Sequence, residues 1–88
     1  MHIPKGFQIR KILDETLAVP GGEAAKQFAG IISLNEVGRF LFEQLQTEQT
    51  AASLVAALLE NYDVDQAAAE QDVEEFLSHL RNAKLLIE

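Results

Sequence analysis

The sequence predicts an α+β fold in which a small three-stranded antiparallel sheet is followed by a bundle of three helices. Two features of the chain support this prediction. Both prolines and four of the five glycines lie within residues 1–33, where they separate short runs of β-forming residues. Residues 34–88 instead repeat apolar side chains at helical spacing and carry eleven carboxylates against three basic side chains. At 88 residues the two parts are expected to form one domain, residues 1–88.

The sheet is expected between about residues 7 and 32, with strands at 7–13, 16–19 and 27–32. Pro20 and the two glycines after it end the second strand, because proline lacks a donor for the strand ladder and glycine reaches positive φ without strain. Gly30 within the third run indicates a bulge or a close approach of another backbone. The apolar residues 85–87 are expected to form a last strand or a docked tail.

The three helices are expected between about residues 34 and 83. Ser33 and Glu36 form a capping-box pattern that predicts the start of the first helix. Thr50 and Asp65 are the expected N-caps of the second and third helices. Gly38 lies within the apolar stripe of the first helix, where glycine costs about 1 kcal/mol relative to alanine. Close packing of another element against Gly38 is expected to offset this cost.

The composition excludes several classes of protein. Cysteine is absent, which rules out disulfides, thiolate zinc sites, iron–sulfur clusters and cysteine nucleophiles. The formal net charge of −7 disfavours non-specific binding of nucleic acid, which requires a basic face. No apolar run approaches the roughly 18–20 residues of a membrane span, and the first residues lack the apolar run of a signal peptide. A soluble, cytoplasmic protein with no membrane partner is therefore expected.

The sequence offers one constellation for catalysis or metal binding. His79 follows Glu75 by four residues, so both share a helix face with Asp72 one turn earlier, and such a pair can bind a metal or transfer protons. No third strong ligand lies nearby, so a solvated, charge-paired helix face is the favoured interpretation. Residues 63–65 lack the spacing and glycine of a calcium loop. We therefore predict no catalytic residue, metal site or cofactor, and no enzymatic activity.

A binding module remains the favoured class. If the predicted strand 27–32 is an exposed edge, its unpaired amides and carbonyls can accept an extended peptide as an additional strand. The third helix would then form one wall of the groove. Lys26, Arg10 and Lys11 would favour acidic side chains in the peptide. The alternative is a structural or oligomerisation module, in which the same edge is covered by the tail or pairs with a second copy in a homodimer.

The helical part also resembles a winged-helix core, a shape that often binds DNA through one helix. Here the helix that would enter the groove of DNA carries Asp72, Glu74 and Glu75. Carboxylates placed near phosphates are repelled, so DNA binding is the less favoured alternative.

One block of the chain resembles the signature of a known family. Residues 33–45 read SLNEVGRFLFEQL, which is similar to the pattern LNE-x-G-R-x-h-x-x-L (h apolar) of the PqqD family, the protein D family of pyrroloquinoline quinone (PQQ) biosynthesis. The order of motifs continues downstream, where the chain follows the family pattern at residues 50–59, 62–65, 72–80 and 85–86. The resemblance covers about residues 7–88.

The resemblance implies a small, winged-helix-like recognition element for ribosomally synthesised and post-translationally modified peptides. Such domains bind the leader of a precursor peptide and present it to a modifying enzyme, often a radical S-adenosylmethionine (SAM) enzyme. The leader joins the sheet as a strand between the third strand and the third helix. Carried over to this chain, the implied strand contacts are Gln27, Phe28, Ala29, Gly30, Ile31 and Ile32. The implied helix contacts are Asp72, Val73, Phe76 and His79.

Overall fold

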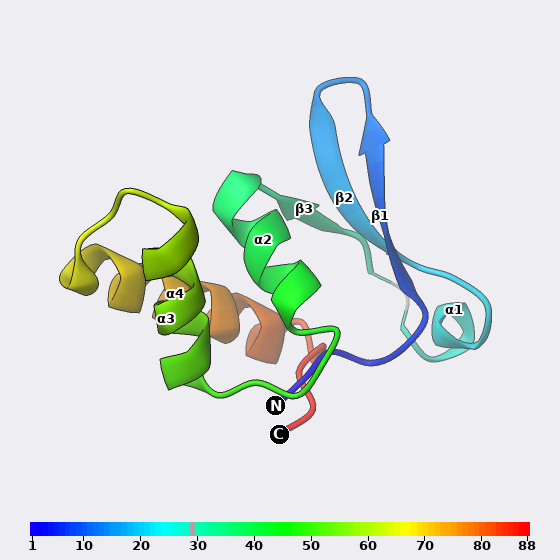
Figure 1. Cartoon of the computed structure of the whole chain (residues 1–88). Helices are drawn as coiled ribbons and strands as arrows, with labels where there is room; N and C mark the ends of the chain where they lie inside the picture. The colour runs from blue at the N-terminus through cyan, green and yellow to red at the C-terminus, as the bar shows by residue number, and fades with distance from the viewer. Residues whose placement is uncertain (29) are drawn as a thin grey trace.

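The structure, a computed structural model, describes residues 1–28 and 30–88 and confirms the α+β class. Three strands form one antiparallel sheet in the order β1-β2-β3: β1 (Phe7–Ile12), β2 (Glu15–Pro20) and β3 (Ile32–Leu34). The helices are α1 (Glu23–Gln27), α2 (Glu36–Gln44), α3 (Ala51–Asn61) and α4 (Gln66–Asn82). Figure 1 shows the β1–β2 hairpin standing at one side of the molecule, with α2 between the sheet and the pair α3 and α4.

The register of the sheet directs one face towards the helices. Ala18 of β2 lies opposite Ile9 of β1 and Ile32 of β3. Directly paired residues point to the same face of a sheet, so this face also includes Phe7 and Leu34, two residues along their strands. Phe7, Ala18, Ile32 and Leu34 are all buried. The inner face of the sheet is therefore apolar, and β3 carries it up to the start of α2.

The predicted third strand at 27–32 is wrong in its position. Residues 23–27, Glu-Ala-Ala-Lys-Gln, form α1, because each of these residue types is a good helix former. Phe28, Gly30 and Ile31 lie between α1 and β3 without joining a strand, while the prediction for Ala29 falls outside the described residues. Among the described residues of the predicted strand, only Ile32 belongs to β3. The strand instead extends to Leu34, because Ile32 and Leu34 alternate onto the buried face.

The predicted cap of the first long helix is also wrong. Ser33 lies in β3 opposite Leu17, so its backbone pairs with the sheet and does not cap a helix. Asn35, the next polar residue, caps α2 instead, and its Oδ1 accepts a hydrogen bond of 2.7 Å from the backbone N–H of Gly38.

The two other predicted caps are confirmed. The Thr50 hydroxyl accepts a hydrogen bond of 3.0 Å from the backbone N–H of Ser53, and Ser53 Oγ accepts one of 2.9 Å from the backbone N–H of Thr50, which completes a capping box. The carboxylate of Asp65 accepts a hydrogen bond of 2.7 Å from the backbone N–H of Ala68. The end of the last helix at Asn82 is within one residue of the expected end.

Gly38 is closely packed, as the sequence predicts. A Cβ atom at this position would lie 3.1 Å from Asn35 Oδ1 and 3.4 Å from Cε1 of Phe76. The absence of a side chain at Gly38 therefore lets the ring of Phe76, on α4, approach the backbone of α2. This contact sets how closely α2 and α4 pack beside the end of β3.

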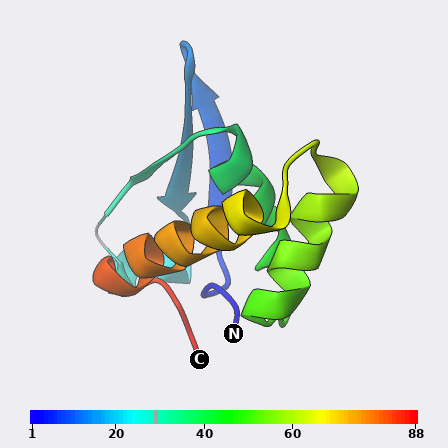
Figure 2. The ribbon, with the colours of Figure 1, turned by 90° about the vertical axis from the view of Figure 1, so that its left-hand side faces the viewer.

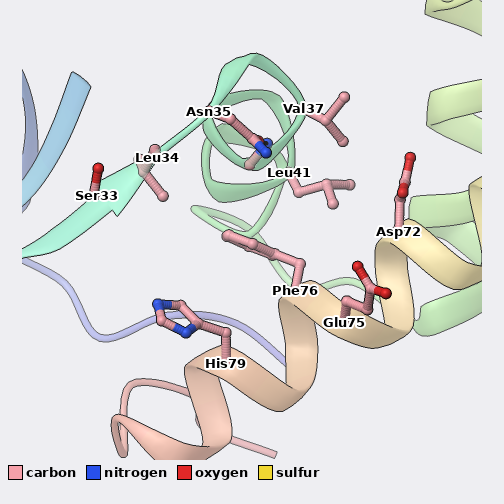
Figure 3. A pocket seen from close by; sticks show the side chains of 10 residues that line it. Ser33, Leu34, Asn35, Val37, Leu41, Asp72, Glu75, Phe76 and His79 are labelled. Carbon is pink, nitrogen blue, oxygen red and sulfur yellow. Dashed lines mark hydrogen bonds between the residues drawn. The ribbon is translucent and has the colours of Figure 1, made fainter. Parts of the chain in front are cut away.

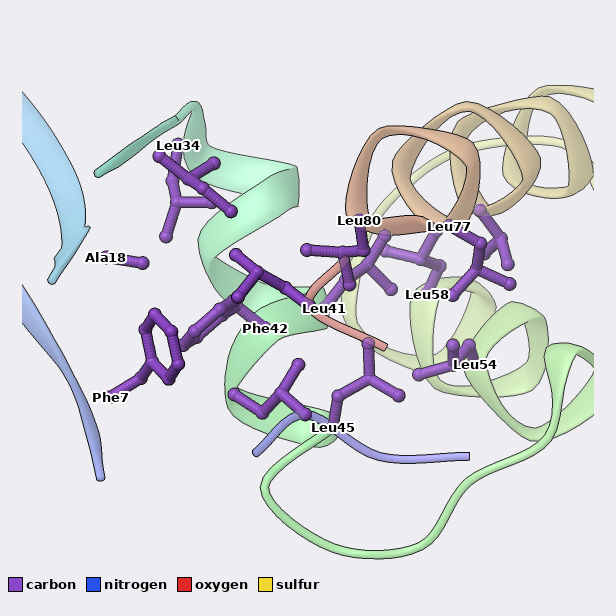
Figure 4. Close-up of a cluster of buried hydrophobic side chains, with 14 of the residues drawn as sticks. Phe7, Ala18, Leu34, Leu41, Phe42, Leu45, Leu54, Leu58, Leu77 and Leu80 are labelled. Carbon is purple, nitrogen blue, oxygen red and sulfur yellow. The ribbon is translucent and has the colours of Figure 1, made fainter. Parts of the chain in front are cut away.

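The core is organised around α2. Leu41 and Phe42 of this helix and its C-cap residue Leu45 are fully buried. The ring of Phe42 packs edge-on against Phe7 of the sheet, with centroids 6.2 Å apart. Figure 4 shows α2 side chains between those of the sheet and those of the last two helices, which contribute Leu54, Leu58, Leu77 and Leu80.

The two ends of the chain lie side by side beneath the helices (Figures 1 and 2). His2 and Ile87 exchange two backbone hydrogen bonds of 2.9 and 2.8 Å. Ile3 and Leu85 are both buried, and the backbone N–H of Ile3 donates to the carbonyl of Leu45. Of the two expectations for residues 85–87, the structure shows a docked tail. In residues 1–28 and 30–88, no helix combines the length and apolar character needed to cross a membrane.

Candidate functional site

A cavity of about 340 Å³ opens where β3 ends, α2 begins and α4 passes. Its apolar walls are Leu34 from β3, Val37 and Leu41 from α2, and Phe76 from α4. Figure 3 shows the Phe76 ring extending from α4 into the space below Leu34 and Leu41, with His79 one turn further along α4. Polar side chains and backbone complete the lining: Ser33, Asn35, Gly38, Asp72, Glu75 and His79.

A second cavity of about 390 Å³ lies beside the first. His79 lines both, so the two cavities follow one another along α4. The second is formed by the segment before β3 and by the C-terminal end of α4, through Gln27, Phe28, Gly30, Ile31, Ile32, Ala83, Lys84 and Leu85. We call the two cavities together the β3–α4 groove.

The pattern of α4 explains why this helix presents one stripe to the core and another to the groove. Val73, Leu77 and Leu80 are buried in the core. Asp72, Phe76 and His79 follow the spacing i, i+4, i+7, which places them on one face of a helix beside the buried stripe. Phe76 and Asp72 are half-buried and His79 is exposed. The groove wall is thus a continuation of the core-facing side of α4.

The structure brings most of the expected contact residues to the groove. The second cavity is lined by Gln27, Phe28, Gly30, Ile31 and Ile32. The first is lined by Asp72, Phe76 and His79. Val73 does not reach the groove, because it is buried and lines the gap between α3 and α4 instead.

The sequence interpretation missed the contribution of α2. Val37 and Leu41 form the wall opposite Phe76, four residues apart on one helix face. The signal was present in Gly38, since a glycine in an apolar stripe marks the place where a second element approaches. Lys84 and Leu85 were also missed, because they enter the groove only through the turn after α4.

That turn is a helix C-cap with Lys84 in the left-handed region, at φ +60°. The backbone N–H of Lys84 donates to the carbonyl of Arg81, and that of Leu85 donates to Leu80 over 2.8 Å. This pair of bonds is a Schellman motif, in which the residue after the cap turns back onto the helix. Buried Leu85 closes the floor of the second cavity, and Lys84 is left exposed at its end.

β3 presents an unpaired edge to the groove. It pairs with β2 on one side, and no other strand in the described part of the chain pairs with it. Along an antiparallel strand, successive residues direct their N–H and C=O groups alternately to the two sides. Within β3, either Ser33 or both Ile32 and Leu34 therefore direct backbone donors and acceptors away from β2. Such an edge is a template for another strand.

The charges of the groove differ between its two ends. Asp72 and Glu75 lie at the cavity beside α2, and Lys84 lies at the opposite cavity. Within residues 1–28 and 30–88, no Lys or Arg comes within 4 Å of either carboxylate, and Glu75 accepts only a neutral hydrogen bond of 3.1 Å from Gln71. The expected pairing of Glu75 with His79 is not formed. The described residues also contain no group of three ligands suited to a metal ion.

The basic residues expected beside the peptide lie elsewhere. Lys26 forms an ion pair of 3.4 Å with Glu23 in α1. Arg10 donates to Oε1 of Gln8 on β1, and neither Arg10 nor Lys11 lines the groove. The sheet therefore does not supply the positive charge that the sequence interpretation assigned to it.

Comparison with solved structures found two similar chains. One is described as TbiB1 in complex with the TbiA(beta) leader peptide; it is 26% identical, with a TM-score of 0.71, and the match covers 98% of this chain and 94% of that one. The other is described as lasso peptide synthetase B1 complexed with the leader peptide; it is 14% identical, with a TM-score of 0.69 and coverage of 99% and 96%. The second likeness concerns the fold alone. Comparison with curated proteins gave no match.

Comparison with protein families supplies the remaining finding. The model of the family described as coenzyme PQQ synthesis protein D matches residues 11–86, which include β2, β3, the four helices and both cavities. The chain therefore belongs to the PqqD family.

Proposed function

We propose that this protein binds the leader segment of a ribosomally made precursor peptide in the β3–α4 groove and presents it to a modifying enzyme. The observation that carries the proposal is the unpaired edge of β3, which faces two adjoining cavities along α4. The membership of the PqqD family supports it, as does the likeness to TbiB1, whose structure is a complex with a leader peptide.

The geometry suits recognition by strand addition. Backbone hydrogen bonds to β3 would hold an extended peptide whatever its sequence, and the cavities would select its side chains. Since successive side chains of a strand point to opposite faces, every second residue of the peptide would face α4. One apolar side chain fits between Leu34, Val37, Leu41 and Phe76, and a second fits against Phe28, Ile31 and Leu85.

In this proposal the protein is a non-catalytic peptide chaperone in the cytoplasm, with residues 1–88 acting as one recognition domain. The chemistry belongs to the partner, which we propose to be a peptide-modifying enzyme of the radical SAM type, as in PQQ-like biosynthesis. The contact residues proposed on the strand side are those from Gln27 to Ile32, now joined by Ser33 and Leu34. On the helix side they are Asp72, Phe76 and His79.

The second candidate function uses the same edge. An unpaired β3 can also pair with β3 of a second copy, which would make the protein an oligomerisation module. Sedimentation of the free protein over a range of concentrations separates the two. A dimer that dissociates when peptide is added is compatible with leader binding, whereas a dimer that excludes every peptide favours the second candidate.

The proposal is tested by a backbone amide NMR titration with a synthetic leader, taken from a short precursor reading frame next to this gene. We expect shifts in residues 30–34 and along the Asp72–His79 face of α4. Phe76→Ala should weaken binding about tenfold or more, because it removes the apolar wall that α4 contributes to the first cavity. Leu59→Ala, on the exposed side of α3, is the matched control and should bind as the unaltered chain does.

Two results would count against the proposal. One is a set of shifts confined to β1 or α3, which would place the peptide on another surface. The other is equal affinity of the unaltered chain and of Phe76→Ala, provided that circular dichroism shows both to be folded.

A further inference from the structure

We infer that the β3–α4 groove selects leaders in which a Lys or Arg accompanies the apolar anchor, and that it binds them in one direction. This inference rests on the proposed function and names the class of peptide that the groove accepts. Its basis is the distribution of charge around the two cavities.

The first cavity combines an apolar interior with carboxylates that have no cationic partner. Asp72 is half-buried at its rim beside Val37 and Leu41, and Glu75 lies one turn along α4. Glu23, Glu43 and Glu88 pair with Lys26, Arg39 and Arg81, whereas most carboxylates in the described part of the chain, like Asp72 and Glu75, form no ion pair. What distinguishes Asp72 and Glu75 is their place beside an apolar cavity. Asp72 lies seven residues after the cap of α4, too far to be stabilised by the positive end of the helix dipole.

The surface beyond the end of β3 is acidic as well. A further cavity of about 660 Å³ shares Ser33, Leu34 and Asn35 with the first cavity and continues over Asp14, Glu15 and Glu36. Its one basic lining residue is Arg39, which is paired with Glu43 over 3.0 Å. A peptide strand leaving the first cavity in this direction would therefore pass between carboxylates on both sides.

The opposite end of the groove has the reverse character. Lys84 is exposed at the end of the second cavity, and Gln27, Phe28 and Leu85 around it carry no charge. A basic residue of the peptide is attracted to the Asp72 end and repelled from the Lys84 end. The charge pattern thus sets both the preferred composition and the direction of the bound strand.

The apolar cavity and the carboxylates act on neighbouring side chains of the same peptide. Asp72 precedes Phe76 by four residues, a rise of about 6 Å along the helix. Two residues of an extended strand span about 6.7 Å and return to the same face. A peptide whose anchor fills the cavity beside Phe76 therefore brings its next residue on that face within reach of Asp72. Lys or Arg at that place would neutralise the carboxylate.

The test is a selection from a displayed library of random peptides of about twelve residues, long enough for one strand with flanks. It compares the unaltered chain with D72N/E75Q, which keeps the shape of both side chains and removes their charge. We expect the unaltered chain to enrich Lys or Arg two residues from an aliphatic or aromatic residue. The double variant should lose the basic preference and keep the apolar one.

Affinity measurements on the selected basic peptides complete this test. D72N/E75Q should bind them about tenfold more weakly, the effect of losing two partly exposed charge pairs. The matched control is E70Q/E74Q, which removes two charges from α4 outside the groove and should change affinity less than about twofold. If both double variants lost the same affinity, the loss would come from the changed net charge of the protein, and the inference would be overturned.

The direction in which the peptide binds is measured by NMR with a spin-labelled peptide. A spin label attached next to the basic residue of a selected peptide should broaden the amide signals of Asn35 and Gly38 more than those of Lys84 and Leu85. The reverse pattern would overturn the inferred direction.

The outcomes also separate this inference from the proposed function. Peptides that bind the unaltered chain, fail to bind Phe76→Ala and show no basic preference would leave leader binding standing and overturn the charge selection. If the unaltered chain enriches no peptide and binds no leader, the proposed function fails and the charge selection fails with it.

Discussion

Two residues other than glycine in the described part of the chain, Leu13 and Lys84, have a positive φ. Leu13, at the tip of the β1–β2 hairpin, has a φ of +56° and is 92% exposed. The two-residue loop Leu13–Asp14 has its positive φ at the first position, where glycine is preferred. Lys84 has a similar φ but lies at the cap of α4, where a turn back to buried Leu85 requires it. Leu13 contributes no comparable packing to the fold.

We expect Leu13→Gly to stabilise the protein by about 0.5–1 kcal/mol. The left-handed conformation costs a residue with a side chain about 1–2 kcal/mol, and the larger backbone entropy of glycine in the unfolded chain offsets part of that gain. The side chain of Leu13 is exposed, so its removal forfeits little burial. The measurement is the midpoint of urea unfolding at unchanged slope. A lower midpoint would mean that Leu13 makes contacts that the fold needs.

At the scale of the elements, local capping signals were reliable where no sheet competed with them. Thr50 and Asp65 follow loops and act as the predicted caps. Ser33 has an equally favourable cap sequence, but its backbone pairs with Leu17 across the sheet, and the helix begins only after Asn35. The third strand also lies later in the chain than the sequence predicts. Residues 23–27 follow their helical propensity, and the strand forms where Ile32 and Leu34 can both be buried.

Removal of the α4 cap should show that this helix depends on it. Asp65→Ala should lower the free energy of unfolding by about 1 kcal/mol, because the backbone N–H of Ala68 loses its acceptor. Asp63→Ala is the matched control, since Asp63 is exposed and has no hydrogen bond from its side chain in the described structure; its effect should stay within about 0.5 kcal/mol. Chemical denaturation of the two variants side by side makes the comparison, and equal losses would argue against a capping role.

At the scale of the whole molecule, α2 joins the sheet to the last two helices, and the chain ends close the base. The radius of gyration is 12.8 Å, slightly above the roughly 12 Å expected for a compact chain of this length, as the projecting hairpin requires. The docked ends matter for the groove, because Leu85 forms part of its floor and is followed by the Ile87 bridge to His2. The N-terminal segment thereby supports the second cavity from below.

We expect Ile3→Ala to destabilise the fold by about 2–4 kcal/mol, because Ile3 is 2% exposed and its loss leaves a cavity against the core. Ile87→Ala is the matched control in the same pair of segments; its side chain is 45% exposed, and the loss should be below about 1 kcal/mol. Thermal and urea unfolding of both variants provide the measurement. Similar losses at the two positions would show that the backbone bridge, and not the burial of Ile3, holds the ends together.

The fold class, the first two strands, the second and third long helices with their caps, and the family could all be predicted from the residues alone. These features depend on side-chain periodicity and on polar residues close in the chain, and both are local properties. The sequence also indicated, through Gly38, that another element packs closely against the first long helix.

The position of β3, the side chains that form the groove and the arrangement of its charges became known from the three-dimensional structure. Val37 and Leu41 meet Phe76 across some forty residues of chain, and Val73 turns away from them into the core. Arg10 and Lys26 lie outside the groove, whereas Lys84 enters it through a helix cap. These features could not be predicted because a binding site consists of contacts between distant segments, whose positions are fixed when the buried faces of all elements pack together.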